Sequence, residues 1–294
     1  MNFNKKYGEN MNQIGIMQGR LSPPQNGRLQ FFPKNDWEKE FQLARNLGFS
    51  SIEWVIDWHE YWNNPVYNLR DVDESFRPIR KLAQTFKVPI QSACFDYLMK
   101  YTLFHRDKNY IEASGVLQNA IPKLAKMGVK IVTIAFVEDV AIKTEEDKKQ
   151  IRDTLNWFSH QLTMYDMEIA LETEMSGEEL EDYIDSFNNP RIGICYDTGN
   201  CITMGHDLSF DIWTLKHRIK EVHLKDRKVG SRQSVYLGTG DVQFSDCFWA
   251  FKLVNFTGPY ILQAWRGDNY LGDAKRQLEY ARSKMELVQN RRQT

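Results

Sequence analysis

The segment Glu168–Asp197, EIALETEMSGEELEDYIDSFNNPRIGICYD, contains one strand–helix–strand unit. Its first part, Glu168–Thr173, and its last, Arg191–Asp197, are short apolar runs of the kind that form buried strands. Between them, Ser176 and Glu179 have the spacing of a capping box, which marks the first turn of a helix. Two strands joined through a helix pair in parallel. The segment therefore predicts one βαβ unit of a parallel sheet.

The same alternation recurs along the whole chain. Eight apolar, β-branched runs are separated by stretches with helical periodicity. These runs are Gln13–Gln18, Ser51–Val55, Val88–Cys94, Val129–Phe136, Glu168–Thr173, Arg191–Asp197, Ile219–Asp226 and Pro259–Ala264. They predict an α/β protein with a single (β/α)8 TIM barrel, in which an eight-stranded parallel sheet closes on itself. An open doubly wound sheet is the competing prediction, but it favours fewer strands and a G-x-G-x-x-G turn, which MQGRLSPP after the first run lacks.

Length and composition limit the classes of protein. The chain has 294 residues and a net charge of −1, with lysine and arginine scattered. This balance argues against nucleic acid or an anionic membrane surface as a partner. No run approaches the roughly 18 apolar residues that a membrane span needs. The barrel is expected to occupy residues 13–294, and the polar residues 1–12, which lack an apolar signal core, are expected to form a flexible N-terminal extension.

The four cysteines show no CxxC pair and no regular spacing. Two of them, Cys94 and Cys195, lie in predicted strands and are expected to be small buried side chains. Without a disulfide pattern, a reduced, cytoplasmic protein is the expectation.

Four consecutive strands end on side chains that can bind a metal ion. Glu172, Asp197, His223 and Gln263 lie at the ends of the fifth, sixth, seventh and eighth predicted strands. In a barrel, functional groups lie at this C-terminal face. Two carboxylates, an imidazole and an amide oxygen suit one divalent ion, Mn²⁺, Mg²⁺, Co²⁺ or Zn²⁺. Each residue alone has an ordinary structural explanation, so the prediction depends on their joint placement.

The surrounding segments resemble the xylose isomerase-like TIM-barrel family. They are GIMQGRLSPP, FSSIEWV, SACFDYLM, IALETEMSGEEL, GICYDTGNC, VHLKDR, LGTGDVQF and GPYILQAWRG, and they cover nearly all of the chain after residue 12. The resemblance implies a sugar or sugar-phosphate isomerase or epimerase with a metal ion on these four positions. In the best-known epimerases of the family the last ligand is a glutamate that also transfers a proton. Gln263 can coordinate through its carbonyl oxygen but cannot take a proton.

Glu172 is the expected catalytic base. A metal ion that chelates a carbonyl and its neighbouring hydroxyl acidifies the adjacent C–H, and a carboxylate can then move the proton through an enediolate. Asp96 or Lys225 would supply the second acid or base. The expected substrate-binding residues are Arg20, Asp96, Asn200, Lys225 and Arg266.

The leading hypothesis is therefore a divalent-metal-dependent sugar or sugar-phosphate isomerase or epimerase, with a homo-oligomer as a possible assembly. One alternative is a keto-sugar or inosose-type dehydratase that uses the same metal site. Another is a non-catalytic sugar-binding protein. A DNA-repair endonuclease on the same barrel would need a multinuclear zinc site, and only six histidines are present, one of them at a predicted strand end.

Overall fold

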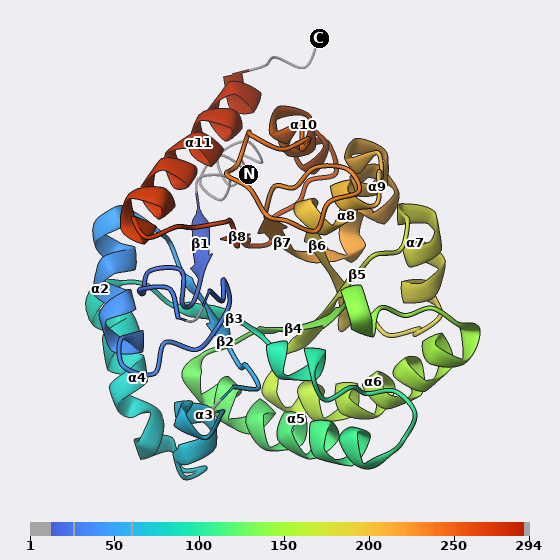
Figure 1. The fold of residues 1–294 in the computed structure, drawn as a ribbon. Helices are drawn as coiled ribbons and strands as arrows, with labels where there is room; N and C mark the ends of the chain where they lie inside the picture. Colours follow the sequence, from blue (N-terminus) through green and yellow to red (C-terminus); the bar gives the residue numbers. More distant parts are fainter. Residues whose placement is uncertain (1–12, 26, 60, 291–294) are drawn as a thin grey trace, which may run out of the picture.

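The computed structural model describes residues 13–25, 27–59 and 61–290. Eight parallel strands form a closed barrel in which each strand pairs with its neighbours in chain order and β8 pairs with β1 (Figure 1). The strands are β1 (Ile14–Met17), β2 (Ile52–Val55), β3 (Ile90–Cys94), β4 (Ile131–Phe136), β5 (Glu168–Thr173), β6 (Ile192–Asp197), β7 (Ile219–Leu224) and β8 (Tyr260–Leu262). The predicted (β/α)8 barrel is confirmed. The expected extension, residues 1–12, lies outside the described residues.

Helices form a ring around the barrel, and the last of them, α11, lies beside the first, α2 (Figure 1). The α-helices are α2 (Trp37–Leu47), α3 (Pro65–Asn68), α4 (Asp73–Phe86), α5 (Lys108–Met127), α6 (Glu145–Tyr165), α7 (Gly177–Asp185), α8 (Thr198–Thr203), α9 (Leu208–Leu215), α10 (Phe244–Leu253) and α11 (Tyr270–Asn290). Short 3-10 turns are η1 (Tyr61–Asn63), η2 (Asp96–Met99), η3 (Glu138–Val140) and η4 (Lys216–Arg218). In α7, Ser176 accepts a hydrogen bond from the backbone N–H of Glu179, as the capping pattern predicts.

The alternation of side chains along each strand separates the outer core from the barrel interior. On β5, Ile169 and Leu171 belong to the main hydrophobic core, whereas Ala170 packs in a small separate cluster with Ile131 and Cys195. The outward side chains therefore pack against the helices, and the alternate ones fill the interior. All residues of β6 and β8 are buried on both faces, as a parallel sheet requires.

The same alternation places the four strand-end residues inside the barrel. Glu172 comes two positions after inward-facing Ala170 on β5. Likewise, Gln263 comes two positions after inward-facing Ile261 on β8. Between these strands, Asp197 and His223 are direct partners in the ladder of β6 and β7. The strands of a barrel tilt and stagger, so inward-facing residues near the ends of successive strands lie at similar heights along the barrel axis. Four adjacent strands thus direct one polar side chain each into the same end of the interior.

No helix among the described residues has the length and apolar character that crossing a membrane would require. The four cysteines are buried and free of disulfides. This matches the expectation of small buried side chains.

Candidate active site

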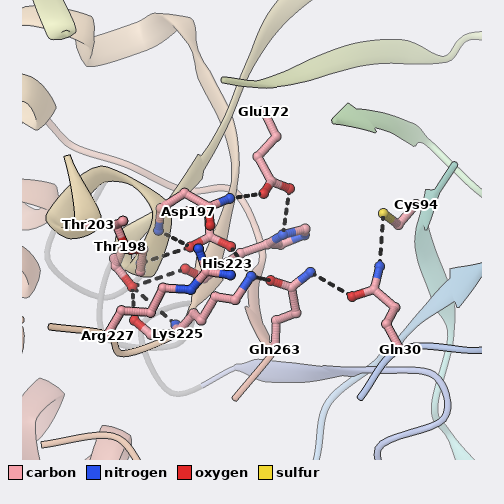
Figure 2. A network of polar contacts seen from close by, with 12 residues as sticks. Gln30, Cys94, Glu172, Asp197, Thr198, Thr203, His223, Lys225, Arg227 and Gln263 are labelled. Atoms are coloured by element: carbon pink, nitrogen blue, oxygen red, sulfur yellow. Dashed lines mark hydrogen bonds and ion pairs between the residues drawn. The ribbon is translucent and has the colours of Figure 1, made fainter. Parts of the chain in front are cut away.

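Glu172 and His223 form the centre of a buried polar network (Figure 2). Glu172 Oε2 lies 3.3 Å from His223 Nδ1, and its other oxygen accepts a hydrogen bond from the Asn200 side chain. His223 Nδ1 and Asn200 Oδ1 are nevertheless buried without a hydrogen-bond partner in the described part of the chain. Buried polar atoms without partners are rare, so these two indicate a place where a ligand would bind.

Asp197 and Gln263 both contact the ammonium group of Lys225. Lys225 Nζ lies 3.3 Å from Asp197 Oδ2 and donates to Gln263 Oε1 at 3.0 Å. The other carboxylate oxygen of Asp197 accepts the backbone N–H groups of Gly199 and Asn200 and so caps α8. Burial opposes ionisation of this carboxyl, but the charges of Lys225, His223 and Arg227 together with the backbone N–H of Asn200 outweigh it, and the pKa of Asp197 is lowered. The site therefore already stabilises positive charge between these two oxygens.

A second layer of carboxylates lies beneath His223. Its Nε2 lies 3.2 Å from Glu53 Oε1 on β2 and 3.9 Å from Glu221 on its own strand. Burial opposes a positive charge on the ring, but neighbouring Cys195 and Glu53 favour it, and the pKa of His223 is raised well above its usual value. Burial and the charge of Glu53 raise the pKa of Glu221 to about 8, while Thr133 donates to its carboxyl. Neither glutamate was predicted from the sequence, although an acidic residue inside an otherwise apolar strand was a usable signal.

A cavity of about 190 Å³ opens above this network at the C-terminal end of the barrel. It is lined by six of the expected residues, which are Arg20, Asp96, Glu172, Asn200, Lys225 and Gln263, whereas Asp197 and His223 lie beneath it. Further polar lining residues are Gln30, Glu138, Arg227 and Ser234, and of these Gln30, Glu138 and Ser234 were not predicted. Arg227 donates to Glu138 at 3.2 Å, and its Nε is buried without a partner in the described chain.

Arg20 faces the cavity because a helix holds its loop. Glu40 on α2 accepts the backbone N–H groups of Gly19 and Leu21 at 3.0 and 3.1 Å, and also the Ser22 hydroxyl. Arg20 donates one weak bond to the Gln263 carbonyl at 3.5 Å, but its Nε and Nη1 have no partner in the described residues. The guanidinium therefore has two buried donors left for a ligand.

Arg266, which we expected to bind substrate, is placed differently. Its guanidinium donates to the carbonyls of Ser22 and Leu29 and lies over the Phe31 ring. It lines a smaller pocket behind the β1 loop and is absent from the lining of the main cavity. In this arrangement Arg266 fixes the loop that carries Arg20.

The sequence profile described as "Xylose isomerase-like TIM barrel" matches residues 41–286. The chain belongs to this family. The resemblance found in the sequence motifs is thereby confirmed.

Named relatives and solved structures agree with this membership. An L-ribulose-5-phosphate 3-epimerase, UlaE, of Escherichia coli O1:K1 is 25% identical over 238 residues, which cover 78% of this chain and 82% of the relative. The structure of D-psicose 3-epimerase with D-tagatose, from Clostridium cellulolyticum H10, is 13% identical, with a TM-score of 0.72 over 93% of this chain and 99% of that one. The IOLI protein with a binding zinc atom is 17% identical, with a TM-score of 0.71 over 96% and 100%.

The donor set of this xylose isomerase-like barrel suits a divalent ion. His223 directs one ring nitrogen to Glu53 and leaves Nδ1 without a hydrogen bond, which is how a metal-binding histidine is commonly held. That nitrogen can carry either a proton or a metal ion, since only the neutral ring binds metal. Ligand atoms of Glu172, Cys195 and His223 lie within 4.8 Å of one another. The oxygens of Asp197 and Gln263, the other two predicted ligands, contact Lys225 instead, so an ion bound by all four predicted residues would have to compete with that ammonium.

Proposed function

We propose that this chain is a divalent-metal-dependent epimerase or isomerase of sugars or sugar phosphates that transfers a proton through an enediolate. The observation that carries the proposal is the place of Glu172, whose carboxylate lines the cavity and also lies 3.3 Å from His223. A bound divalent ion would polarise the substrate carbonyl and acidify the adjacent C–H. Glu172, Asp197, His223 and Gln263 would hold that ion.

The residues of the chain would then move and guide the proton. Glu172 takes it from the carbon next to the carbonyl, while Asn200, hydrogen-bonded to the same carboxylate, fixes the direction of that group. The unpartnered Asn200 Oδ1 is available to a substrate hydroxyl. Return of a proton to the opposite face of the same carbon gives epimerisation, and return to the neighbouring carbon gives isomerisation.

The charges around the cavity favour a substrate with an anionic group. Arg20, Lys225 and Arg227 all line it. Two donors of Arg20 and one of Arg227 are buried without a partner in the described chain, and guanidinium groups bind phosphate strongly. Replacing Arg227 by Met should therefore raise KM for L-ribulose 5-phosphate much more than for D-psicose. An equal effect on both substrates would count against a phosphorylated substrate.

The central test is deuterium exchange. The protein, loaded with Mn²⁺, is incubated in D₂O with L-ribulose 5-phosphate, D-tagatose and D-psicose, and deuterium next to the carbonyl is measured by NMR. Glu172→Gln should reduce incorporation by about 10²- to 10⁴-fold, the usual contribution of a general base. Glu178→Gln, the same change at an exposed position of α7, is the control. Deuterium exchange at the wild-type rate in Glu172→Gln would show that another side chain is the base.

Product mass separates the alternatives. A dehydratase on the same site would release a product lighter by one water. A sugar-binding protein without turnover would bind metal and ligand and exchange no deuterium. Either result would replace the epimerase proposal.

A further inference from the structure

Epimerisation by two groups on opposite faces of the carbon needs, besides Glu172, a second proton-transfer group that Gln263 cannot provide. An amide neither gives nor takes a proton at neutral pH, so the group must be another side chain of the cavity. Besides Glu172, the titratable side chains in its lining are Arg20, Cys94, Asp96, Glu138, Lys225 and Arg227.

Most of these groups are committed elsewhere. The arginines stay protonated. Glu138 is paired with Arg227 at 3.2 Å, and Lys225 is held between Asp197 and Gln263. Burial raises the pKa of Cys94 well above its usual value, which keeps it a neutral thiol. Asp96 has no ion pair within 4 Å in the described chain.

Two amides hold Asp96 at the cavity wall. Gln30 Nε2 donates to Asp96 Oδ1 at 2.9 Å, and Gln263 Nε2 donates to Gln30 Oε1 at 3.1 Å (Figure 2 shows the two glutamines). Gln263 Oε1 in turn accepts from Lys225. The cation at one end and the carboxyl at the other therefore fix which way both amides face. Since the amide bond is made to Oδ1, Oδ2 is the oxygen of Asp96 that can carry a proton.

Asp96 and Glu172 approach the cavity from different directions. Asp96 begins η2 directly after β3, Glu172 lies near the end of β5, and β4 separates the two strands. Both line the same cavity. A substrate bound between them would have one carboxyl on each side of its reacting carbon, which is the arrangement that inversion requires.

The charge environment of Asp96 suits proton transfer near neutral pH. Burial, then the charges of Asp57 and Glu172, raise its pKa to about 7, against the opposing effect of Arg20 and Lys225. A carboxyl with this pKa is partly protonated when a carboxylate base is ionised. One acid and one base can therefore coexist in the cavity.

We propose that Asp96 is the second proton-transfer residue of this site, acting on the substrate face opposite Glu172. The assignment rests on the proposed epimerase function. In one direction the C–H bond breaks as its proton passes to the Glu172 carboxylate, and the electron pair enters the enediolate. A new C–H bond forms on the other face as the carboxylic acid of Asp96 gives up its proton. Glu172 ends protonated and Asp96 ionised, and exchange with water restores both. In the reverse direction the two groups exchange roles.

The test separates exchange from inversion. With L-ribulose 5-phosphate, D-tagatose and D-psicose in D₂O, we expect Asp96→Asn to reduce epimer formation by about 10²-fold or more. Glu172 would still remove and return a proton on its own face, so unreacted substrate would gain deuterium. Asn keeps the acceptor that Gln30 uses, and Asp139→Asn, at an exposed position of η3, is the matched control. A purely structural role for Asp96 would lower exchange and epimer formation together, and that result would overturn the assignment.

A measurement on the unaltered protein avoids any folding defect of the variant. In the first turnover in D₂O, two separate groups place solvent deuterium in the epimer, whereas a single group returns the substrate's own hydrogen. Hydrogen return would overturn the role of Asp96 and leave the epimerase function standing. No exchange on any of the three substrates would overturn both proposals together.

Discussion

The two walls of the cavity are built in different ways. One wall, the strand wall, ends in Glu172, which lines the cavity, and continues beneath it in Asp197 and His223; all three residues project from regular strands into the barrel interior. The other consists of Arg20, Gln30 and Asp96, which lie on the connections after β1 and β3 and are held by long-range hydrogen bonds. The first wall has a charge set suited to a cation. The second adds free donors and a carboxyl of raised pKa. The strand wall thus depends on positions fixed by the barrel, whereas the loop wall depends on contacts between distant connections.

The largest expected effect is on the strand wall. His223→Ala should weaken Mn²⁺ binding by more than about 100-fold, since even groups that only support a metal ligand contribute 10- to 100-fold. Titration followed by electron paramagnetic resonance measures the affinity, and His160→Ala, exposed on α6, serves as the control. Unchanged Mn²⁺ affinity would remove His223 from the metal site and weaken the distinction between the walls.

The strand wall was also the part that the sequence could predict. The period of two along a buried strand and the order of strands in a barrel place Glu172, Asp197 and His223 together without any further information. The loop wall depends on partners that no local pattern reveals. Gln30 contacts Asp96 and Gln263, which lie 66 and 233 positions away. Arg266 follows a strand end in the sequence, yet its connection carries it behind the β1 loop.

A smaller effect on Mn²⁺ affinity is expected at Glu53, which lies beneath His223. Glu53→Gln keeps the shape of the side chain but replaces the carboxylate that faces His223 Nε2, so Mn²⁺ affinity should fall by about 10- to 100-fold. Glu221→Gln is the comparison, because that carboxyl is 3.9 Å from the ring and bonds to Thr133. Thermal unfolding of both variants shows whether they remain folded. An equal loss in the two would indicate a general charge effect and no specific role for Glu53.

The next effect in size is expected in the pH dependence of kcat/KM, through Asp96 on the loop wall. Burial above all raises the pKa of Asp96 to about 7, so its acid form is lost as the pH rises through that value. In the direction in which Asp96 gives the proton, kcat/KM for the epimer should fall about tenfold per pH unit above pH 7. The profile should have the same shape in the reverse direction, because the ratio of kcat/KM in the two directions is the equilibrium constant of a reaction that releases no net proton. Asp96→Asn should lose the fall above pH 7 in both directions. A fall that persists unchanged in Asp96→Asn would contradict the assignment.

The smallest effect is expected at Gln263, where the walls meet. Its oxygen accepts from Lys225 and its nitrogen donates to Gln30, so both ends of the amide are used. Gln263→Glu adds a negative charge beside Asp197 and should tighten Mn²⁺ binding by a few-fold. It also sets a carboxylate oxygen against Gln30 Oε1, where a donor is needed, and this loosens the support of Asp96. Epimer formation should therefore stay level or fall by a few-fold.

The opposite outcome at Gln263 would be equally informative. If the glutamine marks a disabled enzyme, the new carboxylate supplies the missing proton acceptor and epimerase activity appears only in the variant. Deuterium exchange and product analysis on L-ribulose 5-phosphate, D-tagatose and D-psicose measure both cases. Gln263→Leu, which removes the amide without adding a charge, separates loss of the Gln30 contact from the effect of the charge. If epimer formation falls in both Gln263→Glu and Gln263→Leu, the amide itself is needed to connect the strand wall to the loop wall.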